Sequence, residues 1–233
     1  MAGDLSKPGD IYEKLWQEAV AAVGRGAPRL DPFLKNRAGD RRRGVTLVAR
    51  PCPEVCRRIE NFLRQIASVA PEQHFYLPPE FHLTVFSVIP GSESWRESVK
   101  KLPGYLAALE EVLKDRPAFS AAFRGVTASP EAVMVQGFPA GAALAQLRDD
   151  LRSALSRRGL TDGLDRRYKI AAAHLTVVRF STAMADWQPL KALLAAHRNT
   201  DFGETRVRSL QLIEGDWYAS ADSVRTLHEY PLS

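Results

Sequence analysis

Apolar residues along the chain change repeatedly between a helical spacing and the short β-rich runs typical of strands. A helical period extends over residues 11–23 and again over residues 54–69, where Pro53 suits the first turn of a helix. Residues 45–49 form an apolar, β-branched run between these two segments and predict a buried strand. Residues 76–89 are also β-rich. The first third of the chain therefore predicts helix, strand, helix, strand.

The remaining chain continues this alternation. Gly159 follows two basic residues at the end of a leucine-rich helical stripe, and Leu160 is placed for the apolar contact of a Schellman cap. The further elements that we expect are helices over 102–113, 144–155 and 187–196, and strands over 118–126, 133–137, 168–180, 207–218 and 225–230. Strands that alternate with helices predict a mixed α and β fold.

The same order of elements occurs twice. Each half contains a strand, a helix and then a strand that carries His-Leu-Thr-Val, and the two copies start at His82 and His174. An internal duplication of about a hundred residues suits two similar lobes better than a solenoid repeat. We expect residues 1–43 to be an N-terminal helical and loop extension, and residues 44–233 to form one domain of two pseudo-symmetric lobes.

Composition narrows the class of protein. The chain carries a formal net charge of +5, which favours an anionic partner such as a phosphate ester or RNA. Its two cysteines lack the spacing of a zinc site. No apolar run approaches the ~18 residues of a membrane span, and the N-terminus does not resemble a signal peptide. We expect a cytoplasmic monomer that needs no metal or cofactor.

The repeated tetrapeptide is the strongest candidate for a catalytic site. Side chains alternate between the faces of a strand, so each His should share a face with its Thr, together with Phe86 in the first copy and Val178 in the second. Two facing lobes would bring the two pairs to opposite sides of one cleft. The predicted catalytic residues are His82, Thr84, His174 and Thr176.

Two imidazoles and two hydroxyls suit displacement at phosphorus. One imidazole removes a proton from the nucleophile, and the other protonates the leaving oxygen. Imidazole titrates near neutral pH, so one ring can be neutral while the other is protonated. The Thr hydroxyls can donate to the non-bridging oxygens, where negative charge grows in the transition state. This chemistry requires no metal in principle.

The paired motif resembles that of the two-histidine (2H) phosphoesterase superfamily, and most closely its branch of bacterial 2′-5′ RNA ligases and cyclic phosphodiesterases. The resemblance runs from about Gly44 to the C-terminus and includes Arg179, five positions after the second His, and the closing run of residues 212–218. It implies an α+β fold of two lobes, with two antiparallel-rich sheets around a central cleft and helices outside. It also implies opening of 2′,3′-cyclic phosphates, with 2′-5′ ligation in some members.

The chain departs from the family at two places. Residues 1–43 look like an addition to the common core, and residues 87–91 stand where relatives often have a shorter turn. RNA or a small cyclic nucleotide is the expected substrate. Two alternatives stay open: a phosphodiesterase for another cyclic or 2′-5′-linked nucleotide, and a non-catalytic RNA-binding module.

Several residues outside the motifs are candidates for substrate binding. The basic clusters could contact phosphates or form solvated turns, and Arg179 could bind substrate or form an ion pair. Aromatic side chains could stack on a base or belong to the core. His74, His197 and His228 lack any partner pattern, and we expect them at the surface. The candidates are Arg43 with its neighbours Arg41 and Arg42, the cluster Arg166, Arg167 and Lys169, Arg179, and the aromatic residues Tyr76, Phe86, Trp217 and Tyr218.

Overall fold

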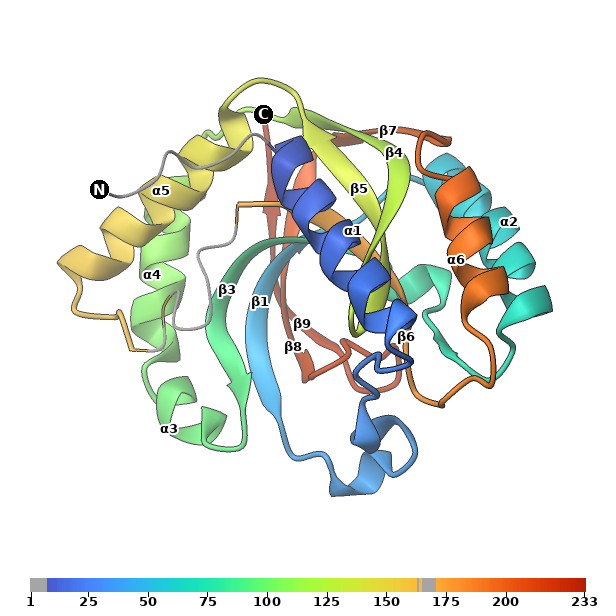
Figure 1. The fold of residues 1–233 in the computed structure, drawn as a ribbon. Helices are drawn as coiled ribbons and strands as arrows, with labels where there is room; N and C mark the ends of the chain where they lie inside the picture. Colours follow the sequence, from blue (N-terminus) through green and yellow to red (C-terminus); the bar gives the residue numbers. More distant parts are fainter. Residues whose placement is uncertain (1–7, 163, 165–170) are drawn as a thin grey trace, which may run out of the picture.

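The described residues, 8–162, 164 and 171–233 of a computed structural model, build one curved antiparallel sheet of nine strands (Figure 1). The strand order is β7-β4-β5-β6-β3-β1-β8-β9, and the short β2 pairs with the end of β6. The strands are β1 (Arg43–Ala49), β2 (His74–Phe75), β3 (Leu83–Ser92), β4 (Phe119–Ser129), β5 (Ala132–Pro139), β6 (Ala173–Arg179), β7 (Asp201–Val207), β8 (Ser209–Asp216) and β9 (Arg225–Pro231).

Helices pack around this sheet in three groups. Figure 1 shows α4 beside α5 on one side, α2 beside α6 on the other, and α1 across β4 and β5. The α-helices are α1 (Pro8–Gly24), α2 (Pro53–Val69), α3 (Trp95–Val99), α4 (Leu102–Leu113), α5 (Ala143–Arg157) and α6 (Gln188–Ala196). No helix in the described part of the chain is long and apolar enough to cross a membrane.

The two motif-bearing strands, β3 and β6, are neighbours at the centre of the sheet. They share a single register pair, Leu83 with Leu175, whereas the strands on either side pair over much longer stretches. The predicted α+β class with antiparallel strands is confirmed. We expected two sheets, but the structure has one, because the short contact between β3 and β6 joins the two halves.

The sheet curls like half of a barrel. Only Arg208 separates β7 from β8, yet β7 is one edge of the sheet and β8 lies next to the other edge. Leu232 N–H donates to the carbonyl of Arg208, and Ala118 N–H donates to the carbonyl of Ser233. These bonds bring the end of the chain to the start of β4. The curl follows from this return path.

Local sequence signals predicted most elements well. The helix over residues 102–113 is found with the same bounds. Gly159 has φ +65°, and Leu160 N–H donates to the carbonyl of Leu155 at 2.9 Å, which is the expected Schellman cap. The helix α3 and the strand β7 were not predicted, because α3 is one short turn and β7 contains a glycine and three charged residues among its seven positions.

Candidate active site

A cavity of about 620 Å³ lies over the two central strands. The four motif residues, His82, Thr84, His174 and Thr176, all line it. Five of the eleven candidate substrate-binding residues line it as well, namely Tyr76, Phe86, Arg179, Trp217 and Tyr218. The fold therefore brings residues that are 92 positions apart in the sequence (174 minus 82) into one cavity.

Each motif strand contains a β-bulge directly after its Thr. The pairing of β3 with β1 skips Val85, and the pairing of β6 with β5 skips Val177. A bulge inserts one unpaired residue and so reverses the alternation of faces beyond it. The expected place of Val178 on the cavity face is therefore wrong: Val178 is buried, and Arg179 takes that face instead.

The ring of His82 is held by the chain that precedes it. Its Nδ1 lies 2.7 Å from the carbonyl oxygen of Glu80. A carbonyl only accepts, so we assign the proton of the neutral ring to Nδ1, which leaves Nε2 with a lone pair. The side chain of Glu80 accepts from Leu77 N–H and Ala221 N–H and fixes this turn. Arg50 also donates to the carbonyl of Phe81, next to His82.

His174 is held differently. Within the described residues, its Nδ1 is buried and has no hydrogen-bond partner. An unpartnered buried N–H is rarer than an unpartnered acceptor, so we assign the proton of the neutral ring to Nε2. Burial, together with the neighbouring charges of His82, Arg148 and Arg179, lowers the pKa of His174 to about 4.

Burial also dominates the titration of His82. Desolvation lowers its pKa to about 4, while the hydrogen bond to the Glu80 carbonyl opposes this effect. Both rings are therefore neutral at pH 7 in the free protein. They differ in tautomer, so that one ring offers an acceptor and the other a donor.

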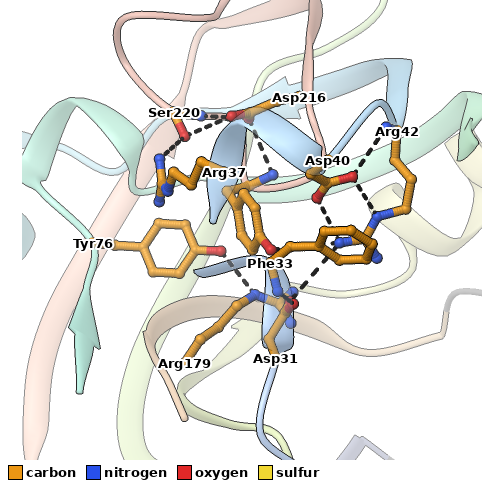
Figure 2. Close-up of polar contacts among 10 residues, drawn as sticks. Asp31, Phe33, Arg37, Asp40, Arg42, Tyr76, Arg179, Asp216 and Ser220 are labelled. Carbon is orange, nitrogen blue, oxygen red and sulfur yellow. Dashed lines mark hydrogen bonds and ion pairs between the residues drawn. The ribbon is translucent and has the colours of Figure 1, made fainter. Parts of the chain in front are cut away.

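Arg179 is the last residue of β6, the strand of the second motif. Its Nε donates to the hydroxyl of Tyr76 at 2.9 Å (Figure 2). Tyr76 is only 4% exposed, so its hydroxyl holds the guanidinium and its ring presents little free surface. The sequence left the role of Arg179 open; the bulge at Val177 decides that it faces the cavity.

A segment before the first strand, residues 31–42, forms the wall behind Tyr218. The guanidinium of Arg37 lies 4.8 Å from the ring centroid of Tyr218, and Nη2 of Arg42 lies 3.4 Å from its hydroxyl. Burial and a hydrogen bond with Asp31 raise the pKa of Tyr218. Figure 2 shows Arg37 bound to Ser220, and Arg42 bound to Asp40 and Asp31, within this wall. The N-terminal segment thus supports the cavity wall from behind, although none of residues 31–42 lines the cavity.

The same wall contains His74, which we expected at the surface. His74 is half-buried, its Nε2 lies 3.0 Å from Arg37, and its ring packs against Tyr76 and Tyr218. The prediction for His74 is wrong because residues 31–42 cover it. His197 is also partly buried, with hydrogen bonds to Thr200 and Gln65, whereas His228 is exposed as expected.

The remaining predicted binding residues have different surroundings. Arg43 is not among the residues that line the cavity, and its guanidinium is bound to Glu214 and Ser223. Phe86 and Tyr218 are each 2% exposed, so neither ring offers a free face for a base. Trp217 lines the cavity and is only partly buried. Arg166, Arg167 and Lys169 lie outside the described residues.

Sequence reasoning missed Arg148. This residue lies on α5 and is 3% exposed. It donates to backbone carbonyls on β3 and to backbone carbonyls of the two residues directly before β6. A signal was present: Arg148 lies on the apolar stripe of its helix, four positions after Leu144 and three before Leu151. A charged residue in such a stripe indicates a buried polar contact.

The described residues contain no group of three or more His, Cys, Asp or Glu side chains arranged to hold a metal ion. The polar groups of the motif strands that line the cavity are the two imidazoles, the hydroxyls of Thr84 and Thr176, and the guanidinium of Arg179. Elsewhere the lining includes Arg152, the hydroxyls of Thr46, Ser87, Ser92, Ser94 and Ser98, and the carboxylates of Glu131, Asp162 and Asp216. The set on the motif strands suits an anion with several oxygens, and it can exchange protons with it.

Comparisons with known structures give the same fold. The chain is similar to TT0787 of Thermus thermophilus, with a TM-score of 0.59 and 16% identity, over 81% of this chain and 97% of that one. It is also similar to E. coli LigT complexed with NADP+ (TM-score 0.54, 14% identity) over 82% of this chain and 98% of that one. The match to E. coli LigT complexed with 3′-AMP has a TM-score of 0.53 at 16% identity, with the same shares covered.

Sequence comparison is decisive at the level of the family. No curated protein sequence matches the chain. The family model described as the 2′-5′ RNA ligase superfamily matches residues 47–217, which span both motif strands and most of the cavity wall. The chain therefore belongs to the 2′-5′ RNA ligase superfamily of two-histidine phosphoesterases.

Proposed function

We propose that this protein is a metal-independent phosphodiesterase that opens 2′,3′-cyclic phosphates, at an RNA end or on a small nucleotide, by two-histidine acid–base catalysis. The observation that carries the proposal is that both His-x-Thr pairs line one cavity together with a guanidinium. Two imidazoles with different tautomers in one cavity suit a reaction that removes one proton and supplies another.

His82 is proposed as the general base. Its Nδ1 proton is directed to the Glu80 carbonyl, so Nε2 is the free acceptor of the neutral ring. The same hydrogen bond supports the positive charge that the ring acquires when it takes a proton from water, because a carbonyl stabilises the imidazolium. His82 is thus oriented for proton abstraction, and the hydrogen bond to Glu80 partly offsets the desolvation that lowers its pKa to about 4.

His174 is proposed as the general acid. Its unpartnered Nδ1 places the exchangeable proton on Nε2. Its pKa of about 4 in the free protein means that the ring must gain a proton when substrate binds. The negative charge of a bound phosphate favours that protonation, because an opposite charge nearby stabilises the imidazolium.

The chemical step then balances. Water loses a proton to Nε2 of His82 as its oxygen bonds to phosphorus, the bond from phosphorus to one ribose oxygen breaks, and Nε2 of His174 protonates that oxygen. Thr84, Thr176 and Arg179 donate to the phosphoryl oxygens as charge develops. If a 5′-hydroxyl replaced water, the same two proton transfers would form a 2′-5′ linkage.

The nucleobase of a substrate can stack on Trp217 at the cavity rim. This aromatic residue lines the cavity and remains partly exposed, and one guanidinium, that of Arg42, lies 4.5 Å from its ring centroid. Aromatic stacking is tolerant of base identity. Stacking on Trp217 therefore fits a nucleotide substrate without selecting one base.

The test is hydrolysis of 2′,3′-cyclic nucleotides by the purified protein in excess EDTA. Turnover should persist in EDTA and should fall by at least about a hundredfold in His82→Ala and His174→Ala, because each proton transfer contributes ~10²–10⁴-fold. His228→Ala is the matched control, since His228 is exposed and outside the cavity lining; its rate should equal that of the wild type.

Two results would contradict the proposal. Turnover that depends on added metal would exclude the two-histidine mechanism. Tight RNA binding without any product between pH 4.5 and 8 would identify a binding module in place of an enzyme.

A further inference from the structure

The contact between the two motif strands is too short to fix their spacing. β3 and β6 share only the pair Leu83 with Leu175. Neighbouring strands usually hold each other through a continuous ladder of backbone hydrogen bonds. Beyond Leu83 the two strands diverge, and backbone carbonyls of β3 near Thr84 and the bulged Val85 have to find other donors.

Arg148 supplies those donors. From α5 its guanidinium donates to the carbonyls of Thr84 at 2.8 Å and Val85 at 2.9 Å on β3. It also donates to the carbonyls of Ala171 at 3.1 Å and Ala172 at 3.0 Å, directly before β6. One planar guanidinium thus joins the backbone of the first motif strand to the residues directly before the second motif strand.

Tyr12 holds the next residue on the β6 side. Its hydroxyl accepts from Ala173 N–H at 3.1 Å and from Gly137 N–H at 3.2 Å, and donates to the Gly137 carbonyl at 3.0 Å. Tyr12 is 1% exposed, and its own carbonyl accepts from the hydroxyl of Thr127. Ala173 is bonded directly to His174, so this hydroxyl fixes the start of the second motif.

Gly137 makes this arrangement possible. A Cβ built on Gly137 would lie 1.9 Å from the carbonyl oxygen of Ala173, a separation that no side chain tolerates. The backbones of β5 and β6 approach closely at this point, and the phenol of Tyr12 enters from α1 to satisfy both N–H groups. The position of Ala173 therefore depends on two residues far away in sequence.

We propose that Arg148 and Tyr12, together called the motif clamp, are positioning residues that set the separation and orientation of the two His-x-Thr pairs. The inference rests on the proposed function, because it concerns the geometry of that reaction. Neither residue is among those lining the cavity, so each acts through the backbone of the motif strands. Tyr12 also lies outside the residues 47–217 that match the family model.

The shape of the guanidinium matters as much as its charge. Arginine carries five N–H donors in a planar fork, whereas lysine has three donors on a single atom. Four carbonyls on two diverging segments match the fork. Lysine would keep the positive charge near His174 but could not hold both segments at once.

The experiment compares Tyr12→Phe and Arg148→Lys with the wild type and with Tyr105→Phe. Tyr105 is the matched control because it is also 1% exposed but lies on α4, contacts neither motif strand through a hydrogen bond in the described part of the chain and is not among the residues that line the cavity. We expect each clamp variant to lower kcat on 2′,3′-cyclic nucleotides about ten- to a hundredfold, with KM changed less than about threefold, since a small misplacement of catalytic groups can cost ~10²-fold. Rates are measured well below Tm and divided by the folded fraction.

A second readout does not depend on turnover. Inorganic phosphate is titrated while the C2–H proton resonances of His82 and His174 are followed by NMR. In the wild type and in Tyr105→Phe, both resonances should move with one Kd. In Tyr12→Phe, the His174 response should be reduced while His82 still responds, because the altered contact lies next to His174. In Arg148→Lys, both responses should be reduced, because the contacts of Arg148 reach both motif segments.

The outcomes separate the inference from the proposed function. If the clamp variants lower Tm but leave kcat and the His174 response unchanged, Arg148 and Tyr12 only stabilise the fold and the inference is overturned. If the wild type does not turn over cyclic nucleotides, the proposed function fails. The phosphate titration then decides the inference by itself. A loss selective for His174 in Tyr12→Phe supports it, and responses equal to those of the wild type in both clamp variants overturn it.

Discussion

The hydroxyl of Tyr76 accepts a hydrogen bond of 2.9 Å from Nε of Arg179. This bond joins the segment before the first motif to the residue that ends the second motif strand. It fixes one edge of the guanidinium and orients the group at the cavity wall, where both residues lie. Because Tyr76 is almost fully buried, the contact is shielded from water and is stronger than a similar pair at the surface.

Removing that hydroxyl should weaken anion binding. In Tyr76→Phe, the ring still fills its place but Arg179 loses an oriented contact. We expect KM for a cyclic nucleotide and Kd for inorganic phosphate to rise about fivefold, since one hydrogen bond contributes about 1 kcal/mol. Steady-state kinetics and calorimetry measure both constants. Unchanged values for both would show that Tyr76 does not hold Arg179.

The two candidate arginines should behave differently. Arg179 lines the cavity, whereas Arg43 is bound to Glu214 and Ser223. Arg179→Ala should lower kcat/KM about a hundredfold, because a hydrogen bond to a charged group contributes about 1.5–3 kcal/mol. Arg43→Ala should leave kcat/KM within about twofold and lower Tm. An equal loss of activity in both variants would place the anion elsewhere.

The low pKa of both imidazoles predicts an acidic optimum for the free protein. Burial lowers the pKa of His82 and of His174 to about 4, so the protonated fraction falls as pH rises above that value. Because kcat/KM reports the free enzyme, it should decline from about pH 5 towards pH 8. Bound phosphate raises the pKa of the acid, so kcat should peak nearer neutrality. A kcat/KM that is flat from pH 5 to 8 would contradict this assignment.

The same pKa values predict acid destabilisation. Each ring is easier to protonate in the unfolded chain, near pH 6.5, than in the folded protein, near pH 4. Their contribution to stability is therefore complete above pH 6.5 and is lost as pH falls towards 4, by up to about 3 kcal/mol for each ring. Urea denaturation at several pH values measures it.

The control for acid destabilisation is the double variant His82→Gln with His174→Gln. It should lose the part of the pH slope between 6.5 and 4 that belongs to these rings, while the carboxylates continue to titrate. Equal slopes in the double variant and the wild type would show that the folded protein does not depress the two pKa values.

The sequence by itself determined the elements and the motif residues. Helix bounds such as Leu102–Leu113 and the cap at Gly159 follow from local periodicity and from the backbone freedom of glycine. The identity of His82 and His174 as the special pair followed from their repeated context. Each of these features depends on residues within a few positions of one another, so the linear pattern contains them.

Tertiary structure decided how the elements form the cavity. The bulges at Val85 and Val177 arise from pairing register between distant strands, and they turn Arg179 towards the cavity. Residues 31–42 cover Tyr218, and the buried guanidinium of Arg148 bridges the diverging motif strands. Local periodicity places Arg148 on a buried stripe but identifies the partners of neither contact. Register and long-range hydrogen bonds depend on which segments meet in space, and the free energy of that choice is shared by the whole fold.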